Sequence, residues 1–329
     1  MVLVKNNKIL LVGGNGYIGY EVQNKLKSNY KIRSCDLLLY STLKEKKKIK
    51  QKNKNLLVKN FKELSVNFLS SFDYIIILAG LVGDPISKKY SKISKQNDLL
   101  DMKKLIMKIS KISIKKAIFV STCSNYGISK SNNLLKENAK LKPLSLYAKA
   151  KVKIENLILS LKKKSHTPFT ILRFATAYGL SKDRMRFDLT INQFILEAIQ
   201  KEDLVVYDKS TIRPYCHVKD FSNIIYKVIK AKNIITNFEV FNCGFNEYNY
   251  SKYQIINLIK KYLKLKFNVN FVNYSKDRRN YKVDFTKLKT RLKIKSVVNT
   301  RKAFIEIKKF IQKNKSSKLF EMGNFKITI

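Results

Sequence analysis

The sequence of 329 residues is poor in the residue types that build metal sites. It contains four cysteines and two histidines, and it has no tryptophan. The cysteines, Cys35, Cys123, Cys216 and Cys243, lack the short spacings typical of zinc ligands, and two histidines cannot complete such a site with them. We therefore expect no metal site, and a reduced, cytoplasmic setting.

Proline and glycine are also scarce, with 4 and 10 residues, and this argues against linkers between separate domains. No apolar run is long enough to cross a bilayer, because the longest, residues 74–82, lies between Asp73 and Asp84. The first eleven residues run straight into a glycine turn and contain no cleavage site of a secretory signal. We expect one large domain or two packed ones, without a membrane partner.

Acidic residues and arginine are few, whereas lysine is abundant. The chain has 23 Asp and Glu against 68 Lys and Arg, a formal charge of +45, and 59 of the 68 are lysine. A nucleic-acid-binding protein more often gathers Arg and Lys on one face or in one tail, but here lysine is spread along the whole chain. This pattern favours a solvated surface over a nucleic-acid footprint. The positive field would still steer an anionic substrate.

Short apolar runs alternate with segments of helical spacing through the first half of the chain. Strands are predicted at residues 8–12, 30–35, 56–58, 73–79, 117–121 and 169–174, and helices at 17–26, 99–109 and 147–161. This alternation predicts an α/β fold with a Rossmann-type doubly wound parallel sheet. The pattern loosens after Thr176, which predicts a smaller C-terminal α/β lobe. The predicted domains are 1–175, joined again by 218–242, and 176–329.

A glycine turn separates the first predicted strand from the first predicted helix. Gly13, Gly16 and Gly19 give the spacing G-x-x-G-x-x-G, which lets a pyrophosphate approach backbone N–H groups at a helix N-terminus. Asp36 ends the second predicted strand about 20 residues on, where a carboxylate accepts hydrogen bonds from ribose hydroxyls. No arginine follows it to hold a 2′-phosphate. These residues predict a dinucleotide site for NAD rather than NADP.

Tyr147 and Lys151 are four residues apart on one face of a predicted helix, so their side chains can meet. A phenol has a reference pKa near 10, and an adjacent ammonium favours its phenolate form, as proton transfer at neutral pH requires. In a chain with 59 Lys and 18 Tyr, this spacing also arises by chance. The position of the Tyr147–Lys151 pair in the chain favours a functional role. The pair follows the glycine turn and the segment STCSNYG, residues 121–127, which ends a buried strand.

Taken in order, these motifs resemble the extended short-chain dehydrogenase/reductase superfamily, and within it the NAD-dependent nucleotide-sugar epimerase/dehydratase family. The matching segments are GGNGYIG (13–19), Asp36, LAGLVGD (78–84), Asn97, STCSNYG (121–127), PLSLYAKAK (143–151), LRFATAYG (172–179), RPYCHVKD (213–220) and DRRNYKVDF (277–285). Motifs that occur in the same order as in the superfamily are specific evidence for membership of it. They are much less specific for the reaction that the protein catalyses.

The resemblance implies a catalytic group of three residues. Thr122 would hydrogen-bond the sugar oxygen, Tyr147 would act as acid and base, and Lys151 would bind the nicotinamide ribose and tune Tyr147. Cofactor contacts are implied for Gly13, Gly16, Tyr17, Ile18, Gly19, Asp36, Ala79 and Gly80, in addition to Tyr147 and Lys151. Substrate contacts are implied for Thr122, Thr176, Arg213 and Arg279, with Arg184, Arg186 and Arg278 as weaker phosphate candidates. The first domain would then bind NAD and the second the nucleotide sugar.

Two departures narrow the implied reaction. Dehydrating relatives carry an Asp-Glu pair directly after the catalytic Thr, and decarboxylating relatives carry a Glu at the position of Ser124. This chain has Cys123 and Ser124 there, so both reactions are disfavoured. Cys123 is interpreted as a small buried residue rather than an extra acid. His217 is interpreted as a structural histidine rather than a catalyst.

We therefore predict NAD-dependent epimerisation of a nucleotide sugar through a transient 4-keto intermediate, as in UDP-glucose 4-epimerases. The alternative on the same fold is a 4-keto-sugar reductase or an NDP-sugar dehydrogenase, either of which would consume cofactor. A non-catalytic NAD-sensing or nucleic-acid-binding relative is a third possibility, supported only by the basic charge. The resemblance also implies a homodimer formed through helices near residues 98–112 and 147–161.

Overall fold

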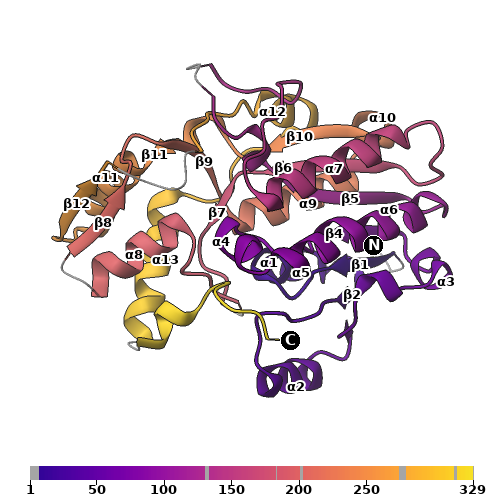
Figure 1. Ribbon diagram of the computed structural model, residues 1–329, viewed down its shortest axis with the longest axis horizontal. Coiled ribbons are helices and arrows are strands. Elements are labelled where there is room, and N and C mark those ends of the chain that lie inside the picture. The colour runs from indigo at the N-terminus through magenta and orange to yellow at the C-terminus, as the bar shows by residue number, and fades with distance from the viewer. Residues whose placement is uncertain are drawn as a thin grey trace.

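Seven parallel strands form the main sheet of the protein, shown in the computed structural model of Figure 1. The structure describes residues 7–129, 133–182, 184–200, 203–273, 279–314 and 317–328. The strands lie in the order β3-β2-β1-β4-β5-β6-β10. They are β1 (Lys8–Val12), β2 (Lys31–Cys35), β3 (Leu56–Leu57), β4 (Tyr74–Ile77), β5 (Lys116–Thr122), β6 (Phe169–Phe174) and β10 (Glu239–Cys243). The predicted Rossmann-type α/β fold is confirmed.

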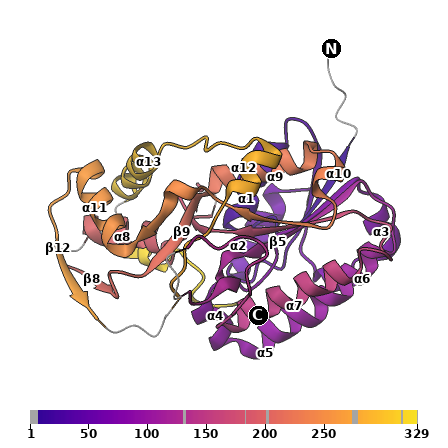
Figure 2. The ribbon, with the colours of Figure 1, turned by 90° about the horizontal axis from the view of Figure 1, so that it is seen from above.

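Helices cover both faces of this sheet, which explains why consecutive residues of its central strands are apolar. Ile9 and Leu11 of β1 face one core, and Leu10 and Val12 face the other. One layer contains α1 (Tyr17–Leu26), α9 (Val218–Lys230) and α12 (Thr286–Leu292); the other contains α6 (Met102–Ser110) and α7 (Leu146–Ser160). Figure 2 shows α6 and α7 on one side of the sheet and α9 on the other.

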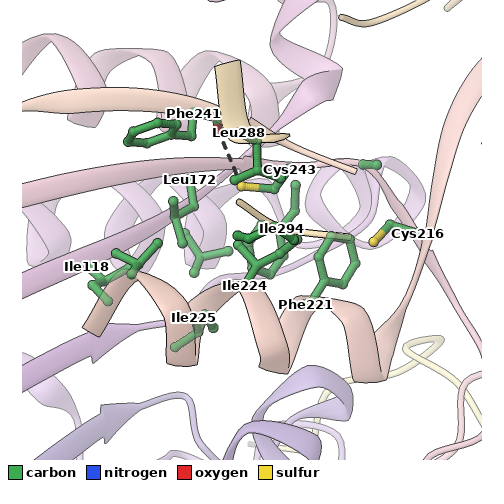
Figure 3. Close-up of a cluster of buried hydrophobic side chains, with 14 of the residues drawn as sticks. Ile118, Leu172, Cys216, Phe221, Ile224, Ile225, Phe241, Cys243, Leu288 and Ile294 are labelled. Atoms are coloured by element: carbon green, nitrogen blue, oxygen red, sulfur yellow. Dashed lines mark hydrogen bonds between the residues drawn. The ribbon is translucent and has the colours of Figure 1, made fainter. Parts of the chain in front are cut away.

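The last strand of the sheet, β10, comes from far along the chain and pairs with β6. Helix α9, which precedes it, packs Phe221, Ile224 and Ile225 into a core with residues of β6, β10 and α12 (Figure 3). Phe221 stacks on Phe174 with ring centroids 4.0 Å apart. Cys243 lies in the same core, and all four cysteines of the chain are buried free thiols.

The second lobe lies beside the carboxyl ends of the strands and contains two small sheets, ordered β11-β9-β7 and β12-β8. Its elements are β7 (Thr176–Tyr178), α8 (Thr190–Gln200), β8 (Asp203–Tyr207), β9 (Ile212–His217), β11 (Asn249–Ser251), α11 (Lys252–Leu263), β12 (Asn268–Val272) and α13 (Thr300–Lys313). Helices α8, α11 and α13 share one apolar core. Figure 1 shows this lobe to the left of the main sheet.

Shorter helices complete the described structure. They are α2 (Leu43–Lys52), η1 (Phe61–Glu63), α3 (Val66–Ser70), α4 (Asp84–Lys89), α5 (Ser91–Ser94), η2 (Lys95–Asp101), η3 (Cys123–Tyr126), α10 (Asn233–Thr236), η4 (Asn246–Tyr248) and η5 (Ser317–Glu321). The helix expected at 99–109 starts earlier, because the π-helical turn η2 runs directly into α6. Within the described ranges, no helix combines the length and the apolar character needed to span a bilayer.

Candidate active site

A cavity of about 770 Å³ opens at the carboxyl ends of the strands of the main sheet, next to the second lobe. This edge of a doubly wound sheet is where such folds bind their ligands. The residues expected to bind cofactor or substrate that line it are Gly13, Gly16, Tyr17, Ile18, Gly19, Asp36, Ala79, Gly80, Thr122, Tyr147, Lys151, Thr176, Arg213 and Arg279. Arg184 and Arg186 also line the cavity, whereas Arg278 lies outside the described residues.

The glycine turn is packed too closely for larger residues. Gly13 has a φ of +84°, and a Cβ there would lie 2.6 Å from the backbone nitrogen of Ala79. A Cβ on Gly19 would overlap the carbonyl of Gly14. Helix α1 begins at Tyr17, and its N-cap residue Gly16 provides no side chain to cap the first N–H groups. The turn therefore presents backbone N–H groups at a helix N-terminus, a geometry that fits a pyrophosphate.

Replacing Gly19 by alanine is expected to weaken NAD binding by about 10- to 100-fold, because an overpacked Cβ costs about 1–3 kcal/mol or displaces the turn. Binding of NADH can be followed by its fluorescence. Asn24→Ala, on the exposed side of the same helix, is the control and should bind NADH like the parent protein. Unchanged affinity of Gly19→Ala would argue against a cofactor at this turn.

Asp36 follows β2 and faces the glycine turn. Its Oδ2 accepts a hydrogen bond from the backbone N–H of Asn15 (2.9 Å), and its Oδ1 accepts one from that of Leu38 (2.8 Å). Burial raises the pKa of Asp36, and the two backbone N–H groups and the charge of Arg184 oppose that shift. Each carboxylate oxygen keeps a second lone pair, so the group can also accept hydrogen bonds from ribose hydroxyls.

Thr122 and Tyr147 reach the cavity from the end of β5 and the first turn of α7. The Thr122 Oγ1 accepts a hydrogen bond from the backbone N–H of Ser124 (3.1 Å) and so caps η3. Ser145 caps α7 by accepting from the N–H of Ala148 (3.1 Å), which sets the position at which Tyr147 enters the helix. Both side chains are about nine-tenths buried, with 8% exposure each.

Lys151 lies one turn after Tyr147 and is buried beneath it. Its Nζ donates hydrogen bonds to the carbonyl oxygens of Val120 (2.8 Å) and Ala79 (3.3 Å), and lies 5.8 Å from the ring centroid of Tyr147. Burial lowers the pKa of Lys151 to about 8, although the carboxylate of Asp98 acts in the opposite direction. The ammonium is therefore held at the junction of two strand ends, beside the phenol that it would tune.

Asp98 is a residue of the site that the sequence analysis missed. Its Oδ1 accepts a hydrogen bond from the backbone N–H of Leu81 (2.9 Å), and its Oδ2 accepts one from Ser94 Oγ (2.7 Å). It lies in the π-helical turn η2, lines the cavity and is only 3% exposed. The sequence does contain one indication of its role. Asp98 precedes the buried Met102 and Leu105 by four and seven residues, so it lies on their apolar helix face, where an acidic residue is unusual.

Two arginines from outside the main sheet, Arg213 and Arg279, line the cavity. Arg279 donates a hydrogen bond from Nη1 to Ser124 Oγ (3.1 Å), and Arg213 projects from β9. Burial raises the pKa of Tyr281, and the charges of both arginines oppose that shift. Since Ser124 follows Thr122 by two residues, the Arg279 guanidinium lies close to the predicted catalytic group. Both arginines line the cavity, where they can bind an anionic phosphate.

Tyr17 joins α1 to the second lobe. Its hydroxyl donates a hydrogen bond to the carbonyl of Gly179 (2.5 Å) and accepts one from Asn192 Nδ2 (3.0 Å). Any contact of Tyr17 with a pyrophosphate must therefore come from its backbone N–H, because the phenol is already bonded.

Cys123 and His217 both turn away from the cavity into the protein. Cys123 is 1% exposed and its thiol donates to the carbonyl of Arg173 (3.2 Å), while burial raises its pKa. His217 is 1% exposed and caps α9, since its Nδ1 accepts from the backbone N–H of Lys219 (3.1 Å). Burial lowers the pKa of His217 to about 3. The structure thus supports the structural interpretation of both residues.

His217 should make the protein sensitive to acid. Its pKa is about 3 when folded against 6.5 as the reference value, so between these pH values only the unfolded chain binds the proton. The contribution of His217 to the free energy of unfolding is therefore fully present above pH 6.5. It falls as the pH drops, by up to about 1.4 kcal/mol per pH unit. His217→Asn keeps an acceptor for the cap and should remove that part of the slope in urea unfolding at pH 4–7. Equal slopes would contradict the assignment.

A sequence profile of the NAD dependent epimerase/dehydratase family matches residues 9–244. The chain belongs to this family. The match covers the main sheet, the glycine turn and the Tyr147–Lys151 pair, and it confirms the resemblance noted from the sequence. NAD is the cofactor named for the family.

Individual relatives are distant but extend over most of the chain. The uncharacterized UDP-glucose epimerase YtcB of Bacillus subtilis (strain 168) is 28% identical over 243 residues, which are 69% of this chain and 74% of that protein. The UDP-glucose 4-epimerase of Lactobacillus helveticus is 24% identical over 275 residues, 77% and 81% of the two chains. A crystal structure of UDP-glucuronic acid 4-epimerase from Bacillus cereus, in complex with UDP-glucuronic acid and NAD, shares the fold. Its TM-score is 0.81 at 24% identity, over 93% of this chain and 99% of that one.

Proposed function

We propose that the protein is an NAD-dependent epimerase of a nucleotide sugar and acts through a transient 4-keto intermediate. The supporting observation is that Thr122, Tyr147 and Lys151 line the same cavity as the glycine turn and the two arginines. A dinucleotide would lie along the glycine turn and Asp36, and the phosphates of the substrate would lie against Arg213 and Arg279. The names of two relatives, a UDP-glucose epimerase and a UDP-glucose 4-epimerase, support the proposed activity.

The residues of the chain divide the chemistry between proton transfer and positioning. Tyr147 would take the proton from the sugar C4 hydroxyl and later return it, and Thr122 would hydrogen-bond the same oxygen. Lys151 would bind the nicotinamide ribose and favour the phenolate of Tyr147 by its charge. NAD, when bound, supplies reversible oxidation of the sugar alcohol. Arg213 and Arg279 would hold the nucleotide in place. The oxidised sugar can then rotate between the two hydride transfers and present its other face to the cofactor.

The surroundings of Thr122 favour epimerisation over loss of water or carbon dioxide. Cys123 and Ser124 are not carboxylic acids, so neither position offers a carboxylate to the sugar. The Cys123 thiol points into the core, and the Ser124 hydroxyl bonds Arg279. Among the described residues that line the cavity, the four acids are already bonded: Asp36 and Asp98 to backbone N–H groups, Asp188 to Arg186, and Glu197 to Gln193.

The absorbance of reduced nicotinamide during turnover separates the two activities that remain. An epimerase regenerates its cofactor in each cycle, so the absorbance should not change while the sugar is converted. A 4-keto-sugar reductase or an NDP-sugar dehydrogenase would change it in proportion to product. A net change would replace the proposed function by that alternative.

We propose that the two domains bind different ligands. Residues 1–175 with 218–242 would bind NAD, and residues 176–329 the nucleotide sugar. The buried free thiols of all four cysteines are compatible with a reduced, cytoplasmic setting.

We also propose a homodimer through η2, α6 and α7. These helices expose four large apolar residues: Leu100, Met107, Leu146 and Leu159. Apolar residues gathered on neighbouring helices are typical of an interface. Sedimentation velocity should give twice the mass of the chain, and Leu146→Asp should shift it toward the monomer. A monomeric parent protein at micromolar concentration would contradict this part of the proposal.

A further inference from the structure

Residues 317–328, here called the crossing segment, leave the second lobe and cross to the main-sheet side of the cavity. Figure 1 shows this yellow end of the chain running from α13 to the neighbourhood of α2. Near its midpoint, the carbonyl of Met322 accepts a hydrogen bond from the backbone N–H of Phe187 (2.7 Å) in the second lobe. At its far end, the N–H of Thr328 donates to the carbonyl of Leu39 (2.7 Å). The segment therefore joins the two sides of the cavity.

The far end of the crossing segment is fixed by packing as well as by hydrogen bonds. Ile327 is 4% exposed and packs with Leu81 and Ile86. The Nζ of Lys46 donates to the carbonyl of Thr328 (3.0 Å), and the N–H of Ile327 donates to Tyr90 Oη (3.4 Å). A buried side chain and several hydrogen bonds to the main-sheet side make this a specific contact rather than a loose tail.

The middle of the crossing segment lies on the cavity itself. Phe320, Asn324 and Phe325 line it, as do Leu38, Leu39 and Tyr40, which come directly after Asp36. Asn324 donates to the carbonyl of Val82 (3.4 Å) and accepts from Arg184 Nη2 (3.4 Å).

Arg184 connects the segment to the Asp36 end of the cavity. Its guanidinium lies 5.8 Å from the ring centroid of Tyr40, and its charge acts to lower the pKa of Asp36. The charge of Arg184 thus acts on the carboxylate that would bind the adenosine ribose, and Asn324 of the crossing segment hydrogen-bonds this arginine.

We propose that the crossing segment forms a third wall of the dinucleotide site, over its adenosine half, and slows release of the cofactor. This rests on the proposed function, which places the adenosine ribose at Asp36. The glycine turn and the Asp36 loop form two walls, and the segment with Arg184 closes the remaining side. Release of the dinucleotide then requires the Ile327 and Thr328 contacts to open. An enzyme that regenerates its cofactor in each cycle has no need of rapid exchange.

The test compares three full-length variants by the rate at which bound NADH leaves on mixing with excess NAD, followed by fluorescence. Ile327→Asp places a charge in a buried apolar contact and should release NADH about tenfold faster or more. Asn324→Ala loses only the contacts to Arg184 and Val82 and should show a smaller increase. Lys326→Asp, at the adjacent exposed position, is the matched control and should release NADH at the parent rate. The amount of NAD that stays bound through purification should be lowest in Ile327→Asp, intermediate in Asn324→Ala, and equal to that of the parent protein in Lys326→Asp.

Release at the parent rate from both Ile327→Asp and Asn324→Ala would overturn the inference and leave the proposed function standing. If Ile327→Asp fails to fold, Asn324→Ala decides by the same criterion. A parent protein that binds neither NAD nor NADH would overturn the proposed function, and this inference with it. Equal acceleration by Lys326→Asp would also overturn it, because charge alone would then explain the effect.

Discussion

Tyr147→Phe should lower the turnover of a nucleotide sugar by about 10²- to 10⁴-fold, the range expected for the loss of an acid–base group. The change removes one hydroxyl and keeps the ring, which is 92% buried. Lys151 keeps its two hydrogen bonds to Val120 and Ala79, so the nicotinamide end of the site should remain formed. Cofactor content should therefore match that of the parent protein.

Turnover is measured by NMR of the sugar products, and bound NAD by its release on denaturation. Tyr226→Phe, on α9, is the control, because it makes the same chemical change at a half-buried tyrosine outside the cavity lining. Epimerisation by Tyr147→Phe at near the parent rate would exclude Tyr147 as the acid and base.

Glu155→Ala should lower the free energy of unfolding by about 3–5 kcal/mol, because it leaves a buried arginine without its counter-ion. Glu155 lies one turn after Lys151 and is 1% exposed. Its carboxylate accepts from Arg173 Nη2 (2.7 Å) and Nε (3.0 Å), from Asn125 Nδ2 (2.8 Å) and from the hydroxyl of Ser121. The network ties α7 to β5 and β6 directly behind Thr122.

Urea unfolding checks the size of this effect. Glu306→Ala is the matched control, since it breaks an ion pair of similar length, 3.0 Å to Lys219, in which both side chains are nearly half exposed. That control should lose no more than about 1 kcal/mol. The double variant Glu155→Leu with Arg173→Leu should recover part of the loss, because no buried charge remains unpaired. A loss for Glu155→Ala no larger than for Glu306→Ala would contradict the buried-pair interpretation.

Six of the seven strands of the sheet could be predicted from the sequence, because most of them are short apolar runs bounded by turn or charged residues. The expected strand at 169–174 is Phe169–Phe174, and the weakest, at 56–58, is the two-residue strand Leu56–Leu57. The glycine turn and Asp36 could be placed together for the same reason, since adjacent parallel strands end at one edge.

The parts that the sequence did not reveal depend on contacts between distant segments. Asp98 lies in the π-helical turn η2, and its partners Leu81 and Ser94 become visible only in the structure. Glu155 and Arg173 lie on different elements, and neither shows its partner in the sequence. Residues 317–328 do not show their partners in the sequence, and only the packing of Ile327 and hydrogen bonds such as that from Thr328 to Leu39 show where the segment crosses.

The decisive measurement follows UDP-glucose and other nucleotide sugars by NMR during incubation with the purified protein, while the absorbance of reduced nicotinamide is recorded. The expected result is conversion of one sugar to its C4 epimer without added cofactor and without a net change in that absorbance. Conversion that consumes or produces reduced nicotinamide in proportion to product would contradict epimerisation.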